Sequence, residues 1–293
     1  MHETLDEHKI ASLIHLLEDE DEETYRLIYP QIMEMGGSMM PYILDAQDRS
    51  IDNLLNARLK ELYQQLNLQH TLDEFRDWKL HNSRNLYQGL SVLSKYQYPR
   101  LELRKISEII NKIRQDLWLE VNDNLTALEK VRIINHLFFD VYKFRGDTKE
   151  YYAPENSFIN DVLIRKKGNP LNLSAIYSII AQSVNIPIYG VNLPRNFMLV
   201  YVEKLYSQPL NTIQKTDVLF YINPFNRGEI HSQNDILNYL KKIHLEPKEE
   251  YYLPCSNLIT LQRSVNNLIK IYSNKGEENT AENYRKILKV LME

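Results

Sequence analysis

Hydrophobic residues recur with the period of an α-helix through the first half of the chain. Ile10, Leu13, Ile14 and Leu17 fall at the spacing that places side chains on one face of a helix. A second helix ends at the Gly36-Gly37 pair. The same pattern predicts further helices over about 38–46, 51–68, 84–96, 100–120 and 126–143.

The middle of the chain carries the pattern of β-strands. Residues 197–202 and 218–222 are rich in β-branched and aromatic residues, and 186–193 is a shorter candidate. The polar segment 207–217 between the two stronger strands predicts a hairpin loop. Because no helix separates these strands, we expect them to pair antiparallel.

Helical periodicity returns near the end of the chain. It predicts a helix over 232–243 and a closing helical hairpin over 257–274 and 277–292. The sequence therefore predicts a mostly helical α+β protein in three parts. These are helical hairpins with a HEAT-like flavour over 1–83, a core over 84–248, and a C-terminal hairpin over 249–293 that is similar to one tetratricopeptide unit.

Charge and cysteine content exclude several classes of protein. The net charge is −4, without the basic excess that a nucleic-acid-binding domain usually carries, so we expect no nucleic-acid partner. The single cysteine, Cys255, excludes an intramolecular disulfide and a multi-cysteine metal site. The polar, acidic N-terminus does not read as a signal peptide, and no apolar run is long enough for a membrane helix. These features favour a cytoplasmic protein without cofactor or metal.

The segment 156–177 has clear helix boundaries in its sequence. Ser157 is the expected N-cap of a first helix, and Gly168 is the expected residue after its end. Asn169 is placed to cap a second helix with Pro170 in its first turn, the one helical position that suits proline. An apolar stripe in this second helix predicts that it is buried.

Four motifs in this order resemble the bacterial SirB-type branch of the transglutaminase-like superfamily. They are Asn-Ser-Phe-Ile-Asn-Asp-Val-Leu at 156–163, Gly-Asn-Pro-Leu-Asn-Leu-Ser-Ala-Ile-Tyr at 168–177, Gly-Val-Asn-Leu-Pro-Arg-Asn-Phe at 190–197, and Tyr-Ile-Asn-Pro-Phe-Asn-Arg-Gly at 221–228. The resemblance is specific over about 150–230. It implies a helix packed on a small antiparallel sheet.

The resemblance also implies where catalytic residues should stand. Active members of the superfamily use a cysteine at the start of the buried helix, a histidine on the next strand and an aspartate on the strand after it. The corresponding positions here hold Pro170, Asn196 and Asn223. The SirB-type branch typically shares the proline but tends to keep the histidine and the aspartate. An amide is no general base near neutral pH, and no nucleophile remains for it to activate.

The leading hypothesis is therefore a catalytically inactive, transglutaminase-like binding or scaffolding module. Its expected binding residues are Pro170, Asn172, Asn196, Asn223 and His231, and its partner is an unidentified protein or peptide. An alternative is a hydrolase or amide-processing enzyme that uses another residue set in the same cleft, such as a water activated by His231. A third is an interaction protein acting through its helical flanks. The sequence leaves the oligomeric state open.

Overall fold

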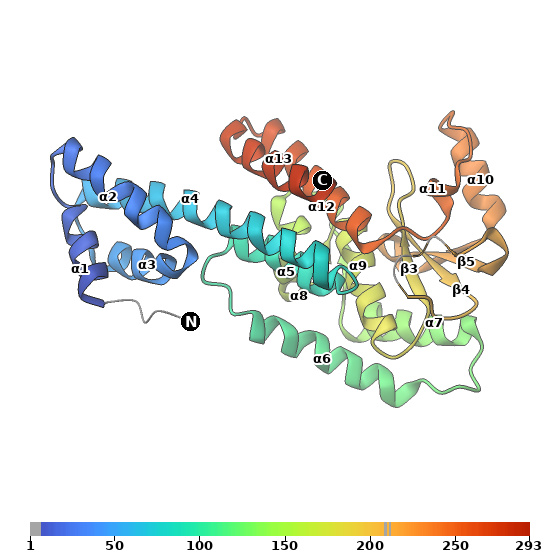
Figure 1. The fold of residues 1–293 in the computed structure, drawn as a ribbon. Coiled ribbons are helices and arrows are strands. Elements are labelled where there is room, and N and C mark those ends of the chain that lie inside the picture. Colours follow the sequence, from blue (N-terminus) through green and yellow to red (C-terminus); the bar gives the residue numbers. More distant parts are fainter. Residues whose placement is uncertain (1–6, 208–209, 211) are drawn as a thin grey trace. The chain divides into compact units, whose positions relative to one another are not determined.

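The computed structural model describes residues 7–207, 210 and 212–293 of the chain (Figure 1). Two compact units are present, unit 1 up to Glu74 and unit 2 from Phe75 to Glu293. The three-part division expected from the sequence stays a prediction. The mostly helical α+β class is confirmed, since helices surround one small antiparallel sheet.

Unit 1 consists of helices packed around one apolar core. Its helices are α1 (Glu7–Leu16), α2 (Glu22–Met35), η1 (Gly36–Met39), α3 (Met40–Arg49) and most of α4 (Asn53–Asp77). Asp21 caps α2 by accepting hydrogen bonds from two backbone N–H groups of its first turn. Arg58 is buried and donates to the Leu17 carbonyl over 3.0 Å and to Glu22 over 3.1 Å. The acidic residues at 18–23 therefore form the turn between α1 and α2 and the beginning of α2.

Unit 2 contains the remaining helices and all the strands found among the described residues. Its helical elements are η2 (Trp78–Asn82), α5 (Leu86–Gln97), α6 (Leu103–Glu120), α7 (Ala127–Asn135), η3 (His136–Val141), η4 (Pro154–Ser157), α8 (Ile159–Arg165), α9 (Pro170–Gln182), η5 (Lys215–Asp217), η6 (Pro224–Asn226), α10 (Gln233–Lys242), α11 (Glu249–Tyr252), α12 (Asn257–Asn274) and α13 (Glu278–Met292). The closing pair α12 and α13 forms the predicted helical hairpin, drawn in red in Figure 1.

The sheet is an antiparallel meander, as predicted from the absence of helices between its strands. It is ordered β3 (Ile188–Val191), β4 (Met198–Val202), β5 (Val218–Asn223) and β6 (Glu229–His231). The register aligns Gly190 with Leu199 and Val200 with Tyr221. A separate parallel pair joins β1 (Arg145–Gly146) to β2 (Lys167–Gly168). The central strand β4 is buried at every residue, so both faces of the sheet are covered there.

Helix α9 is the buried centre of unit 2. Almost all of its side chains are buried, including those of Leu173, Ile176 and Tyr177. The Tyr177 hydroxyl finds a partner by donating to Asn135 Oδ1 over 2.9 Å. Asn135 in turn donates to the Gly228 carbonyl over 3.1 Å, which ties α7 to the turn before β6. Helix α9 is mostly apolar because neighbouring elements cover it on nearly every side.

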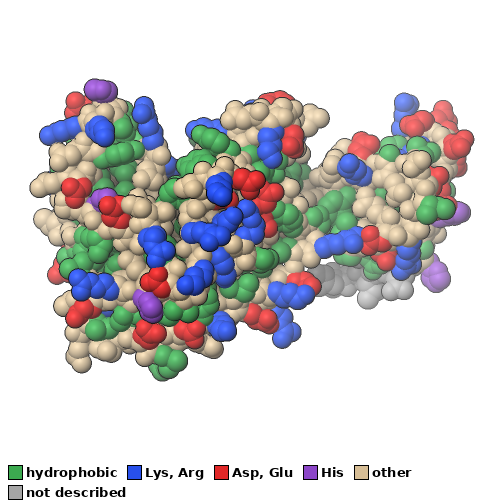
Figure 2. Space-filling model, turned by 180° about the vertical axis from the view of Figure 1, so that it is seen from behind, with side chains coloured by type: hydrophobic (Ala, Val, Ile, Leu, Met, Phe, Trp, Pro, Cys, Tyr) green, Lys and Arg blue, Asp and Glu red, His purple; other side chains and the backbone are tan. Residues whose placement is uncertain are grey.

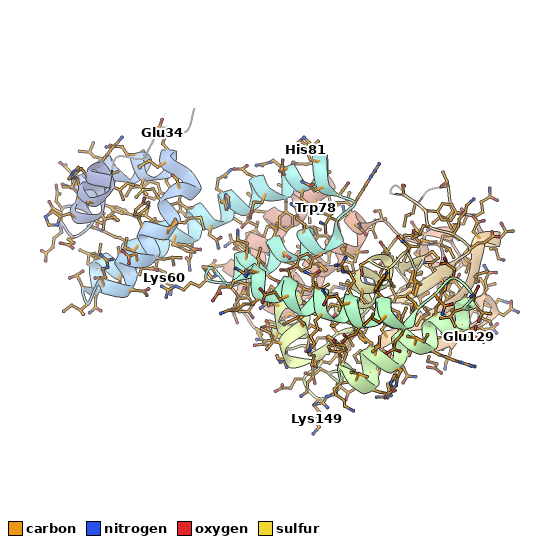
Figure 3. The ribbon with its side chains drawn as sticks, turned by 90° about the horizontal axis from the view of Figure 1, so that it is seen from below. Glu34, Lys60, Trp78, His81, Glu129 and Lys149 are labelled. Carbon is orange, nitrogen blue, oxygen red and sulfur yellow. The ribbon has the colours of Figure 1, made fainter. Side chains whose placement is uncertain are left out.

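Trp78 fixes the start of unit 2 and can be followed in Figure 3. Its ring nitrogen donates to the Asn85 carbonyl over 2.9 Å, and its side chain is almost fully buried. A Cβ atom at Gly89 would stand 2.9 Å from this ring, so a glycine is required where α5 passes the indole. The indole of Trp78 and the missing side chain of Gly89 together determine how closely α5 packs against Trp78.

Two helix-boundary predictions in the 156–177 segment are wrong. Ser157 lies in η4, and Phe158 precedes α8 without a side-chain cap. The Ser157 hydroxyl instead accepts a hydrogen bond from Asn169 Nδ2 over 3.0 Å, so it supports the cap of the next helix. Helix α8 ends at Arg165 and is capped by Lys166, whose φ of 58° is left-handed, and Gly168 lies in β2. Pairing between β1 and β2 therefore replaces the expected glycine-terminated helix end.

The predicted hairpin loop at 207–217 falls partly outside the described residues, at 208, 209 and 211. Its last part forms η5, and Gln214 and Asp217 cap each other there.

Within the described part of the chain, none of the helices combines the length and the apolar character needed to cross a membrane.

Candidate functional site

The start of α9 is built as the sequence predicted. Asn169 is the N-cap, and its Oδ1 accepts a hydrogen bond from the Asn172 backbone N–H over 2.8 Å. Pro170 occupies the first turn, where it has no N–H to leave unpaired. The position predicted from the resemblance to correspond to the catalytic cysteine is thus a buried ring without acid–base or nucleophilic capacity.

The loop between β3 and β4 is held by an arginine from the C-terminal hairpin. Arg263 of α12 donates to Asn192 Oδ1 over 2.5 Å, to the Leu193 carbonyl over 2.8 Å and to the Asn196 carbonyl over 2.9 Å. Its guanidinium also lies 5.5 Å from the centroid of the Phe197 ring. These contacts fix the loop that carries Asn196, the residue predicted from the resemblance to stand at the histidine position.

The same loop contains a backbone conformation that side chains rarely adopt. Arg195 has a φ of 61°, in the left-handed region, and its side chain is exposed. Such a conformation costs about 1 kcal/mol or more at a non-glycine residue and is retained only where neighbouring contacts hold it. The bonds from Arg263 on either side of Arg195 supply that support.

These elements enclose a cleft of about 630 Å³ within unit 2. This volume lies in the usual range for a small-molecule or peptide site. The walls come from the start of α9, the β3–β4 loop, one face of α12, and the tyrosine pair that precedes η4. The lining residues are Tyr151, Tyr152, Asn169, Pro170, Leu171, Asn192, Pro194, Arg195, Asn196, Phe197, Ile259, Gln262, Arg263, Asn266, Asn267, Lys270 and Ile271.

Only part of the predicted binding set meets in this cleft. Pro170 and Asn196 both line it. Asn172 is fully buried behind the helix start and is not a lining residue. Asn223 and His231 also lie outside the lining. Whether these five residues bind a ligand stays a prediction, and the geometry favours Pro170 and Asn196.

Asn223 and His231 have local roles at the edge of the sheet. The Asn223 side chain accepts a hydrogen bond from the Asn226 N–H over 3.4 Å and so caps η6. His231 pairs with Tyr221 in the β5–β6 ladder, and its Nε2 lies 3.5 Å from Glu229. Glu229 stands opposite Asn223 in this ladder, and His231 lies two residues further along β6.

The lining of the cleft is basic and rich in carboxamides. Arg195, Arg263 and Lys270 supply the charge, and no Asp, Glu or His belongs to the lining as the described residues define it. Burial lowers the pKa of the Arg263 guanidinium, because desolvation disfavours its charged form. Burial also raises the pKa of the Tyr151 phenol. Neither group is a general base near neutral pH.

The lone cysteine lies behind the cleft and not in it. Cys255 is buried and packs against Leu171 and Phe197, whose other sides line the cleft. Its Sγ lies 3.6 Å from Thr260 Oγ1. Burial raises the pKa of the Cys255 thiol to about 11, so the thiolate is scarce at neutral pH. This environment agrees with a small apolar filler.

We expect Cys255 to resist alkylation as long as the chain is folded. With a pKa of about 11, roughly one thiol in a thousand is ionised at pH 8, against about a quarter for an unperturbed thiol. Because the folded-state pKa is raised, the buried thiol stabilises the fold below the unfolded pKa, and this contribution is lost as the pH rises towards 11.

Mass spectrometry after iodoacetamide treatment at pH 8 measures this reactivity. Labelling of the folded chain should be at least about a hundred times slower than labelling in denaturant. Equal rates in the two states would show that the thiol is accessible and ionised, and would reopen a cysteine mechanism.

Sequence reasoning missed the wall that α12 contributes. Ile259, Arg263, Asn266 and Lys270 recur at helical spacing on this helix and form a mostly polar stripe opposite its apolar face. This stripe is visible in the sequence, but it has the same appearance as a solvated helix face. Tyr151 and Tyr152 likewise gave no signal of their own.

Comparison with known proteins identifies the family. The family model described as the transglutaminase-like superfamily matches residues 102–266, which is more than half of the chain, so the chain belongs to this superfamily. The predicted resemblance is thereby confirmed. The match spans α6 to the middle of α12 and includes every strand described above.

The relatives are bacterial and animal proteins of moderate similarity. A UPF0162 protein of Xylella fastidiosa is 25% identical over 190 residues, 62% of this chain and 63% of that protein. A UPF0162 protein of Pasteurella multocida is 33% identical over 101 residues, 34% of this chain and 37% of that protein. F-box only protein 21 of Homo sapiens is 28% identical over 143 residues, 49% of this chain and 22% of that protein.

The chain therefore spans less than two thirds of the length of these relatives. No solved structure gives a significant match.

Proposed function

We propose that this chain is a binding protein that uses the cleft of a transglutaminase-like fold without covalent catalysis. The observation that carries the proposal is Pro170 at the start of α9, the position at which the family resemblance predicts the cysteine of active members. Pro170 lines the cleft, and a proline side chain offers no nucleophile there.

The remaining lining residues support binding over chemistry. Asn196 lines the cleft at the position that the resemblance predicts for the general base, and an amide does not take a proton near neutral pH. Carboxamides both donate and accept hydrogen bonds, which suits recognition of peptide groups. The cleft has the volume of a ligand site, and Arg263 holds one of its walls through bonds to Leu193 and Asn196.

A hydrolase that uses His231 remains the alternative, and its geometry is less favourable. His231 lies on the edge strand β6 with its Nε2 3.5 Å from Glu229, and neither residue lines the cleft. Such an enzyme would need the histidine, or a water bound to it, to reach a substrate in the cleft. Interaction through the helical flanks stays a prediction.

An assay for amide hydrolysis and for amine incorporation tests the proposal. The full chain is incubated with capped glutamine peptides and a fluorescent primary amine, and ammonia release and amine adducts are measured. We expect neither product to exceed the buffer blank. Turnover that is lost in Asn196→Ala would overturn the binding role.

Two control variants identify the source of any turnover that does appear. Cys255→Ala reports on the buried thiol, and His231→Ala reports on the alternative hydrolase. Because both side chains lie outside the cleft lining, these variants should leave peptide binding unchanged.

A further inference from the structure

The cleft of unit 2 concentrates positive charge that has no acidic counterpart in its lining. Arg195, Arg263 and Lys270 contribute side chains to the lining, and no carboxylate does so among the described residues. Glu150 and Glu155, the acids nearest to the tyrosine pair along the chain, are not lining residues. On the face drawn in Figure 2, by contrast, acidic side chains are scattered around and among the basic ones.

The most buried of these cations is bonded only to neutral groups. Arg263 is partly buried, and its hydrogen-bond acceptors are the Asn192 amide and the carbonyls of Leu193 and Asn196. Arg195 and Lys270 form no hydrogen bond or ion pair with the residues that the structure describes. A cation removed from water without an anionic partner is electrostatically unfavourable. An anionic ligand in the cleft would supply that partner.

The spacing of the cations indicates more than one negative group on the ligand. Arg263 and Lys270 are separated by two turns of α12, which corresponds to about 10 Å along the helix axis. A single phosphate or carboxylate does not bridge such a distance. An extended peptide advances about 3.3 Å per residue, so acidic side chains some three residues apart match it.

The carboxamides suit the backbone of such a peptide. The side chains of Asn196 and Asn267 line the cleft and form no hydrogen bond with the described part of the chain. Each offers one acceptor and two donor hydrogens, as the N–H and C=O groups of a peptide require. Tyr151 and Tyr152, with ring centroids 5.0 Å apart, add an aromatic wall against which an apolar side chain can pack.

We propose that this cleft binds an extended acidic peptide segment of a partner protein. Its carboxylates contact Arg195, Arg263 and Lys270, and its backbone contacts Asn196 and Asn267. This inference rests on the proposed binding function and adds the chemistry of the ligand. Oligonucleotide binding is less favoured, because the whole chain carries a net charge of −4.

Isothermal titration with capped octapeptides of equal length tests the inference. Three peptides carry Glu, Gln or Lys at the same three positions, so that the first two differ in charge and hardly in shape. We expect the Glu peptide to bind the full chain at least tenfold more tightly than the Gln peptide. Its affinity should fall when sodium chloride is raised, because salt screens the charges.

A charge-matched pair of variants locates the effect. Lys270→Glu should weaken binding of the Glu peptide at least tenfold. Lys242→Glu changes the net charge equally at an exposed position on α10, outside the cleft, and should change the affinity less than twofold. Equal weakening by both variants would indicate non-specific attraction and would overturn the inference.

The remaining outcomes separate the two proposals. If the Gln peptide binds as tightly as the Glu peptide and loses affinity in Asn196→Ala, the acidic preference is wrong and the binding function stands. If none of the three peptides binds at millimolar concentration, both proposals fail. If a single-stranded oligonucleotide displaces the Glu peptide at lower concentration than the peptide itself, the ligand class is wrong.

Discussion

Gly228→Ala should lower the free energy of unfolding of unit 2 by about 3–5 kcal/mol. Gly228 has a φ of 73°, and an added Cβ would stand 2.0 Å from Asn135 Oδ1. The Asn135 amide is not free to move aside. It accepts a hydrogen bond from the fully buried Tyr177 hydroxyl and donates one to the Gly228 carbonyl. The substitution therefore breaks buried hydrogen bonds in addition to straining the backbone.

Gly276→Ala is the matched control for this prediction. Gly276 has a φ of 77°, and an added Cβ would meet no atom within 4 Å. This variant isolates the backbone strain and should cost about 1 kcal/mol. Both tryptophans, Trp78 and Trp118, lie in unit 2, so their fluorescence during denaturant unfolding reports on this unit. Equal effects of the two variants would show that the Asn135 contact does not matter.

Phe197→Ala should have an effect of similar size, about 3–5 kcal/mol, and should also abolish ligand binding. The Phe197 side chain is almost fully buried, and only 1% of the residue is accessible to water. The Phe197 ring packs on Leu171 and Cys255 and lies under the Arg263 guanidinium. It also fills the space beside Gly190, since a Cβ atom added to Gly190 would stand 2.7 Å from Phe197 Cζ. Its removal leaves a cavity between α9, the sheet and α12.

Leu219→Ala provides the control for an apolar truncation in the same sheet. Leu219 lies on β5 and is 50% exposed, so its loss should cost about 0.5 kcal/mol or less. Tryptophan fluorescence measures the stability of both variants, and isothermal titration with the acidic octapeptide measures binding. Unchanged binding in Phe197→Ala would show that the floor of the cleft is not part of the site.

Local sequence patterns predicted the elements well where the pattern itself decides the structure. The apolar stripe of α9, with Asn169 and Pro170 at its start, requires no tertiary information. The prediction of strands at 197–202 and 218–222 also agrees with β4 and β5. Strand β6 was missed because Glu229–His231 is short and polar, and only its pairing with β5 defines it.

The errors at Ser157 and Gly168 share a physical cause. Both residues carry a local preference for a helix boundary, and in both cases a contact with a neighbouring element replaces it. Ser157 bonds to the Asn169 side chain, and Gly168 pairs in β2 with Gly146. Propensity is a weak preference that tertiary contacts override.

The cleft was predictable only on one side. The family resemblance placed Pro170 and Asn196 from motifs that are close together in the sequence, and both line the cleft. The opposite wall, with Arg263 and Lys270, lies about 70 residues further along the chain, and nothing in the sequence alone indicates that α12 returns to this point. Asn223 was grouped with them by motif order, whereas the sheet places it where it caps η6.

Equilibrium dialysis tests most directly whether the cleft binds peptides and leaves them intact. The full chain is dialysed for a day against an equimolar mixture of the acidic and glutamine octapeptides, and both chambers are then analysed by mass spectrometry. We expect the acidic peptide to accumulate on the protein side, with the masses of both peptides unchanged. Equal concentrations in the two chambers, or a peptide whose amides have been hydrolysed in an Asn196-dependent manner, would contradict a binding role without chemistry.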